Sequence, residues 1–144
     1  MEAFFETQGI CTFSPPLNAK GSTKRRDGKS TEWWMILECD RRIGAYFRQL
    51  YEMESFGVRT LKEPLWGTHV SVIRDEQPED AAKWKELEGM TLPIQYSNQV
   101  QVYGSYAFVE ARCEEALIYR ETLGLSKQPE FPLHMTIGNL KSSS

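Results

Sequence analysis

Two short segments of this chain repeat one alternating pattern, and each contains one of the only two histidines. The first is His-Val-Ser at residues 69–71, and the second is His-Met-Thr at residues 134–136. Successive side chains of a β-strand point to opposite faces, so the imidazole and the hydroxyl share one face in each segment and the apolar residue takes the other. Both segments are therefore predicted to be strands with one polar and one apolar face.

Apolar runs and the turn residues between them predict the remaining elements. The patterns predict strands over 9–13, 33–39, 66–74, 92–97 and 99–112, the last bent at Gly104, before the strand that carries the second motif. Helical spacing of apolar residues predicts helices over 40–55, 78–88 and 114–123. Groups of strands separated by helices predict a single α+β domain over residues 1–144, with a largely antiparallel sheet.

Length and charge limit the classes of protein to consider. The 144 residues suit one domain, and a net charge of −3 gives no general attraction to nucleic acid or to an anionic membrane. No apolar run is long enough to cross a bilayer, and the acidic N-terminus lacks the basic start and apolar core of a signal peptide. We therefore expect a cytoplasmic protein that binds neither membranes nor, stably, DNA.

The three cysteines, Cys11, Cys39 and Cys113, do not form a metal-binding pattern. They are widely spaced, they include no CxxC pair, and neither histidine lies near one of them in sequence. This spacing does not support a zinc site. We expect reduced thiols that pack as small apolar side chains, and no metal or cofactor.

Residues 18–31 are polar, contain glycine and are rich in positive charge, which predicts an exposed and mobile loop. Its cations are Lys20, Lys24, Arg25, Arg26 and Lys29. The loop could fold over a polyanionic substrate as a lid, with Lys20, Arg25 and Arg26 as substrate-binding residues, or it could be a solvated segment that keeps the protein in solution. The last four residues, 141–144, are expected to fray.

The paired motifs supply the groups that phosphodiester cleavage needs. Because imidazole titrates near pH 6.5, one histidine can act as a base while the other acts as an acid. A hydroxyl on the same face as each imidazole can bind the oxygens on which charge gathers in the transition state, and this arrangement requires no metal. The predicted catalytic residues are His69, Ser71, His134 and Thr136. Alternatively, both histidines are half-buried strand residues whose neighbours have β propensity.

The pair His69-Val70-Ser71 and His134-Met135-Thr136, with Phe131-Pro132-Leu133 before the second motif, resembles the 2H phosphoesterase superfamily, the LigT-like proteins. The resemblance implies a two-lobed α+β fold with largely antiparallel sheets, flanking helices and a central cleft lined by both motifs. It also implies metal-independent action on nucleotide phosphodiesters. Ser71 stands where the family more often has Thr, and the chain is shorter than typical bacterial members.

The short chain, and the stretch 11–16 with the basic loop after it, resemble a small phage branch of that superfamily. Members of the branch are anti-CBASS phosphodiesterases, which cleave cyclic di- and trinucleotide immune signals such as 3′,3′-cGAMP; a phage-encoded member would act in the host cytoplasm. Trp66 and Tyr106 could stack on a base, whereas most other aromatic residues are expected in the core. Three alternatives remain: an RNA end-processing enzyme acting on 2′,3′-cyclic termini or 2′–5′ bonds, a protein that sequesters a nucleotide, and a structural protein.

Overall fold

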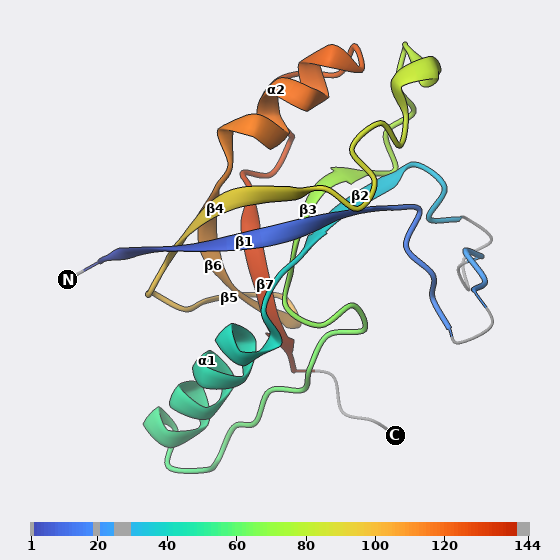
Figure 1. Cartoon of the computed structure of the whole chain (residues 1–144). Helices are drawn as coiled ribbons and strands as arrows, with labels where there is room; N and C mark the ends of the chain where they lie inside the picture. The colour runs from blue at the N-terminus through green and yellow to red at the C-terminus, as the bar shows by residue number, and fades with distance from the viewer. Residues whose placement is uncertain (1, 19–20, 25–29, 141–144) are drawn as a thin grey trace.

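The computed structural model describes residues 2–18, 21–24 and 30–140 (Figure 1). In chain order the elements are β1 (Phe4–Phe13), β2 (Trp34–Glu38), α1 (Arg41–Glu54), β3 (His69–Arg74), a 3₁₀ turn η1 (Ala81–Lys83), β4 (Thr91–Ser97), β5 (Gln101–Tyr103), β6 (Tyr106–Arg112), α2 (Glu114–Thr122) and β7 (His134–Asn139). Both predicted motif segments are strands, β3 and β7. No helix in the described ranges is long and apolar enough to span a bilayer.

The strands form one antiparallel sheet in the order β4-β1-β2-β3-β7-β6-β5. An additional antiparallel pairing between β4 and β6 joins the two sides of this sheet and closes six strands into a barrel. The α+β class and the largely antiparallel sheet are therefore confirmed. Among the described residues the strands form one continuous sheet, and they do not show the two lobes and central cleft that the family resemblance implies.

Inward-facing side chains of the strands fill the barrel with an apolar core. Val70 and Val72 of β3 and Met135 and Ile137 of β7 are fully buried there. The two helices pack at opposite ends of the strands (Figure 1). Phe47 from α1 joins the core, as do residues 116, 119 and 123 in and next to α2. Burial of these faces is what fixes the register of β3 and β7, since a slip of one residue would turn every side chain to the other face.

The helix predicted over 40–55 is confirmed by α1, with Asp40 as its N-cap accepting a hydrogen bond from the backbone N–H of Arg42 at 2.9 Å. The helix predicted over 114–123 is α2, and Gly124 follows it with a φ of +83°. These two elements were predictable because a capping residue or a terminal glycine bounds an apolar stripe in each case.

Two predicted elements are wrong. The helix predicted over 78–88 is reduced to η1, because Trp84 is extended with a ψ of 136° and Lys85 after it has a φ of +70°, neither of which a right-handed helix can accommodate. The long bent strand predicted over 99–112 is a hairpin of β5 and β6, in which Gly104 has a φ of +61° and makes a turn rather than a bend. The 18–31 loop and the 141–144 tail lie partly and wholly outside the described residues.

The chain contains a structural repeat that its sequence does not display. The order strand, strand, helix, motif strand occurs twice, as β1-β2-α1-β3 and as β5-β6-α2-β7. The two motif strands pair with each other, and outward from this seam lie β2 and β1 on one side and β6 and β5 on the other. The two halves are therefore related by an approximate twofold axis that passes between β3 and β7.

Candidate active site

The pairing of β3 with β7 brings the two motifs together. His69 lies directly opposite Thr136, and Val70 lies opposite Met135. The same register, continued by one residue, brings Ser71 beside His134. Residues directly opposite in an antiparallel pair point to the same face, and residues two apart on one strand share that face. All four motif side chains therefore lie on the outer face of the barrel, which we call the motif face.

The neighbouring strands extend this arrangement into two rows with reversed order. One row runs across β2, β3, β7 and β6 as Glu38, His69, Thr136 and Phe108. The other runs across the same strands as Ile36, Ser71, His134 and Glu110. The twofold axis exchanges each carboxylate, imidazole, hydroxyl and apolar residue of one row for its counterpart in the other. The site thus presents equivalent chemistry on both sides of its centre.

Each imidazole is oriented by the same backbone contact. Nδ1 of His69 lies 2.8 Å from the carbonyl oxygen of Gly67, and Nδ1 of His134 lies 2.9 Å from that of Pro132. A carbonyl oxygen can only accept a hydrogen bond, so Nδ1 must carry the proton and donate it. In the neutral ring Nε2 then carries no proton, and its lone pair can accept one, as a general base requires.

Burial makes the two imidazoles electrostatically unequal. His69 is only 7% exposed, whereas His134 is half-buried. Burial lowers the pKa of His69 to about 4, and nearby positive charge on His134 and Arg74 adds to this. Burial, with the cation of Arg74, also lowers the pKa of His134. The His69 ring is therefore neutral at pH 7, and the His134 ring is the more accessible to solvent.

A β-bulge follows the hydroxyl of each motif. On β3, Val72 is an extra residue between the partners of Met35 and Ile36. On β7, Ile137 is an extra residue between the partners of Ala107 and Phe108. A bulge bends its strand and shifts the following side chains to the opposite face. The two bulges occupy equivalent positions in the two halves.

An arginine from a helix binds the carbonyl oxygen of each bulge residue. Arg120 of α2 donates from Nη1 to Val72 at 2.9 Å, and Arg48 of α1 donates from Nη1 to Ile137 at 2.7 Å. Each helix comes from one half and binds the bulge of the other half. Bulged backbone groups left out of the ladder need such partners when buried. The two arginines therefore fix the strands on which the motifs lie.

The bulge on β3 places a cation on the motif face. In a regular strand Arg74, three residues after Ser71, would point to the apolar face. Because the bulge adds one residue, Arg74 instead points to the same face as Ser71 and lies opposite Trp34. Its guanidinium carbon lies 5.6 Å from the centre of the Trp34 ring. Arg74 was missed by sequence reasoning. The signal was the adjacent apolar pair Val72-Ile73, both fully buried, which breaks the alternation.

Both predicted base-stacking residues lie on the motif face. The Trp66 ring lies 5.6 Å from that of His69, edge to face, and its Nε1 donates to the carbonyl of Pro16 at 2.8 Å. Tyr106 of β6 lies opposite Asn139 of β7, and Tyr106 is 47% exposed. The predicted cations Lys20, Arg25 and Arg26 fall outside the described residues. Lys24 is described, and it forms an isolated antiparallel bridge with Ser30.

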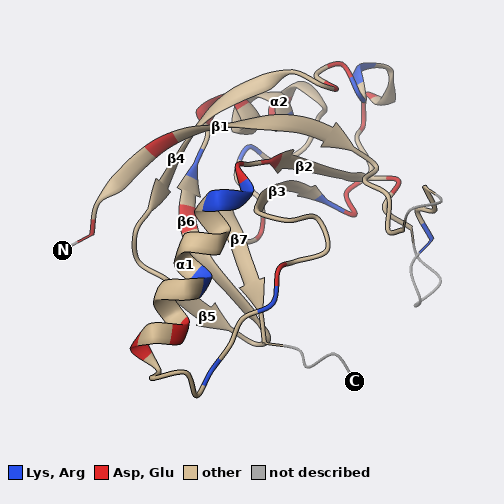
Figure 2. Cartoon of the chain, turned by 60° about the horizontal axis from the view of Figure 1, so that its bottom comes forward, with Lys and Arg blue, Asp and Glu red and all other residues tan. Residues whose placement is uncertain are grey.

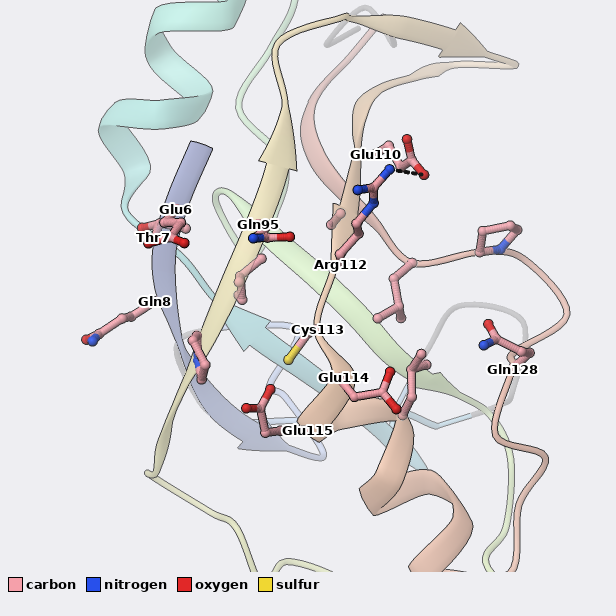
Figure 3. Close-up of a pocket in the computed structure, with 16 residues that line it drawn as sticks. Glu6, Thr7, Gln8, Gln95, Glu110, Arg112, Cys113, Glu114, Glu115 and Gln128 are labelled. Carbon is pink, nitrogen blue, oxygen red and sulfur yellow. Dashed lines mark ion pairs between the residues drawn. The ribbon is translucent and has the colours of Figure 1, made fainter. Parts of the chain in front are cut away.

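A hollow of about 800 Å³ lies beside the motif face, between β1 and β4 on one side and β6 and α2 on the other (Figure 3). It adjoins the site through Glu110 and Pro132. Four carboxylates and one guanidinium line it, from Glu6, Glu110, Glu114, Glu115 and Arg112. This balance disfavours a phosphate there. Acidic and basic residues are interspersed along the described part of the chain, without one extended basic surface (Figure 2). Binding of a phosphate would therefore depend on individual cations.

The cysteines contribute no ligand cluster. In the described part of the chain, no three His, Cys, Asp or Glu side chains gather in a way that could hold a metal ion. Cys11 and Cys113 are buried and Cys39 is half-buried. Burial raises the pKa of Cys39 to about 12 and that of Cys11 to about 11, so these thiols are protonated at pH 7.

Comparison of the chain with protein-family models, with curated proteins and with solved structures found no match. The family resemblance therefore stays a prediction from the two motifs, and the geometry of the motif face is the basis on which a function can be proposed.

Proposed function

We propose that this protein is a metal-independent phosphodiesterase that cleaves nucleotide phosphodiester bonds on the motif face. The observation that carries the proposal is the β3–β7 register, which sets two imidazoles and two hydroxyls on one surface with an approximate twofold relation. Both imidazoles keep Nε2 free because Nδ1 donates to the backbone. A tetrahedral phosphate between them would meet an acid, a base and two hydroxyl donors.

In the proposed mechanism His69 is the base and His134 is the acid. Nε2 of His69 takes the proton of a ribose 2′-OH, whose oxygen forms a bond to the adjacent phosphorus as the bond from phosphorus to the 5′ oxygen breaks. Nε2 of His134 gives its proton to that departing oxygen. Ser71 and Thr136 donate hydrogen bonds to the non-bridging oxygens. The product is a linear nucleotide that ends in a 2′,3′-cyclic phosphate.

The asymmetric burial of the histidines supports this division of roles. A base must be neutral before the reaction, and the lowered pKa of His69 keeps it so. An acid must exchange protons with solvent, and His134 is the more exposed ring. The negative charge of a bound phosphate favours the imidazolium form of His134, which opposes the effect of burial.

We further propose cyclic di- or trinucleotides as substrates. In support, the twofold rows place the same residue types on both sides of the central phosphate position, which suits a diester flanked by two nucleosides. In this proposal the two halves of the chain correspond to the two lobes of the family, and the substrate binds across the boundary between β3 and β7. Cleavage of 2′,3′-cyclic termini or 2′–5′ bonds uses the same groups, and substrate rates separate these activities.

The test is product analysis by mass spectrometry, in EDTA, with 3′,3′-cGAMP, a cyclic trinucleotide, a 2′,3′-cyclic mononucleotide and a 2′–5′ dinucleotide. We expect linear products from the cyclic oligonucleotides, and loss of turnover in His69→Ala and His134→Ala. Thr136→Ala should lower kcat by about 10²-fold or more, as removal of an oxyanion donor does. Thr12→Ala is the matched control, since Thr12 lies on the same face but on β1, three strands away from Thr136 on β7, opposite Ile36.

Three results would count against the proposal. Failure of every substrate to turn over would refute a phosphodiesterase, and tight binding with intact ligand would indicate sequestration instead. Equal rates in the wild type and both histidine variants would remove the motifs from the chemistry. Faster turnover of 2′,3′-cyclic or 2′–5′ substrates would redirect the activity to RNA ends.

A further inference from the structure

The charge on the motif face is one-sided, although its other chemistry is paired. Arg74 follows the bulge of β3, and Asn139 follows the bulge of β7 at the equivalent position. One end of the seam therefore carries a guanidinium and the other carries a neutral amide. Arg74 lies at the end where Ser71 and His134 meet.

Arg74 is exposed, and on the motif face its pair with Trp34 is the next outward-facing pair after Ile36 and Ser71. Aromatic rings connect it to the first motif in steps of 5.5 to 5.6 Å: Arg74 lies over Trp34, Trp34 lies against Trp66, and Trp66 lies against His69. Burial is the main reason that the pKa of each histidine is lowered, and the positive charge of Arg74 adds to this effect. Stacking on Trp34 holds the planar guanidinium while leaving its N–H groups free to bind oxygens.

The backbone around Arg74 is fixed by an ion pair between the buried Arg120 and the half-buried Glu76. Arg120 is only 1% exposed, and it binds the bulge carbonyl of Val72 as well as both carboxylate oxygens of Glu76 at 2.8 Å. Glu76 also accepts a hydrogen bond from the backbone N–H of Arg74. The backbone on both sides of Arg74 is thus held by one guanidinium from α2.

We propose that Arg74 binds the non-bridging oxygens of the scissile phosphate and stabilises their charge in the transition state. This inference rests on the proposed phosphodiesterase activity. It adds a substrate-contacting cation to the two motifs, and it makes Arg120 and Glu76 positioning residues for that cation. A phosphodiester carries one negative charge before the reaction and gains more in the transition state, so a fixed guanidinium favours the transition state over the bound substrate.

The test compares steady-state kinetics of Arg74→Ala and Arg74→Lys on whichever substrate the wild type cleaves fastest. We expect kcat to fall by about 10²- to 10³-fold in the alanine variant, with a smaller change in KM. Lysine should restore part of kcat because it restores charge without the planar fork. Added guanidinium chloride should also raise the rate of the alanine variant, relative to sodium chloride at equal concentration, because the Trp34 ring remains to bind it.

The matched control is Arg59→Ala, which removes another exposed arginine, one that lies after α1 and on none of the strands that form the motif face. It should keep the wild-type rate and show no guanidinium effect. Wild-type turnover together with an unimpaired Arg74→Ala would overturn the inference and leave the phosphodiesterase standing. A slow Arg74→Ala that neither lysine nor guanidinium improves would indicate a structural role and also overturn it. An inactive wild type would overturn both proposals together.

Discussion

Replacement of the buried imidazole by a neutral amide, in His69→Gln, should make the protein less sensitive to acid. Above pH 6.5 the His69 ring is neutral in both the folded and the unfolded chain, so it adds no pH dependence. As the pH falls below 6.5 the unfolded chain takes up a proton, whereas the folded ring, with its pKa lowered to about 4, stays neutral. Wild-type stability therefore falls between about pH 6.5 and pH 4.

The size of this effect follows from the two pKa values. One pKa unit corresponds to about 1.4 kcal/mol, so the shift from 6.5 to about 4 costs the folded state about 3 kcal/mol at a pH below both values. At pH 5 about 2 kcal/mol of this is already lost. Other groups that titrate in this range, such as Glu76, contribute equally to both proteins and cancel in the comparison.

The assay is urea unfolding of the wild type and His69→Gln at several values between pH 8 and pH 5. We expect the free energy of unfolding of the wild type to decrease by about 2 kcal/mol more than that of the variant. His134→Gln is the matched control, and because that ring is more exposed its replacement should flatten the curve less. Parallel curves for the wild type and His69→Gln would show that His69 is not held neutral by burial.

Three further outcomes follow from the same structure. Arg120→Met should destabilise the fold by about 3 to 5 kcal/mol in urea unfolding, because it leaves Glu76 and the bulge carbonyl without their partner; a loss below about 1 kcal/mol would contradict this. The kcat/KM profile should fall on the acid side near pH 4, as His69 becomes protonated, and on the alkaline side below pH 6.5, as His134 loses its proton; a plateau extending above pH 8 would contradict the assigned roles. Cys39 is half-buried and burial raises its pKa to about 12, so at pH 7.5 it should react with a thiol reagent far more slowly than a free cysteine; reaction at the rate of a free cysteine would contradict this.

The motif strands could be predicted because their alternation is local. One buried face and one polar face can be read from residues 69–71 and 134–136 alone, and α1 could be placed from Asp40 and the apolar stripe after it. That β3 and β7 are neighbours could not be read from the chain. Their pairing joins residues 65 positions apart, from 69 to 134, and depends on how the whole sheet closes.

The features that were missed depend on backbone irregularities. The bulge at Val72 reverses the alternation and carries Arg74 to the motif face, although the sequence alone assigns it to the other side. The extended backbone of Trp84 and the positive φ of Lys85 interrupt the helix predicted over 78–88, and no glycine marks either position. Alternation and helical spacing assume regular backbone, so they fail where a bulge or a left-handed residue changes the face.

The two arginines that bind the bulges show why the structural repeat cannot be found by comparing the two halves of the sequence. Arg48 and Arg120 each donate a hydrogen bond to the carbonyl oxygen of one bulge residue. Arg48 lies 21 residues before His69, whereas Arg120 lies 14 residues before His134. A shift of seven residues hides the equivalence from any comparison at fixed spacing. Only the hydrogen bonds to Val72 and Ile137 reveal it.

Nitrogen-15 NMR of the two imidazoles, before and after addition of a phosphorothioate analogue of 3′,3′-cGAMP, tests most directly whether both rings act on one phosphate. The chain has only two histidines, so His69→Gln assigns both signals. We expect the Nδ1–H tautomer in both rings at pH 7.5, and changes at both Nε2 atoms that follow a single binding curve. A response from one ring alone, or an Nε2–H tautomer in either ring of the free protein, would contradict a shared site.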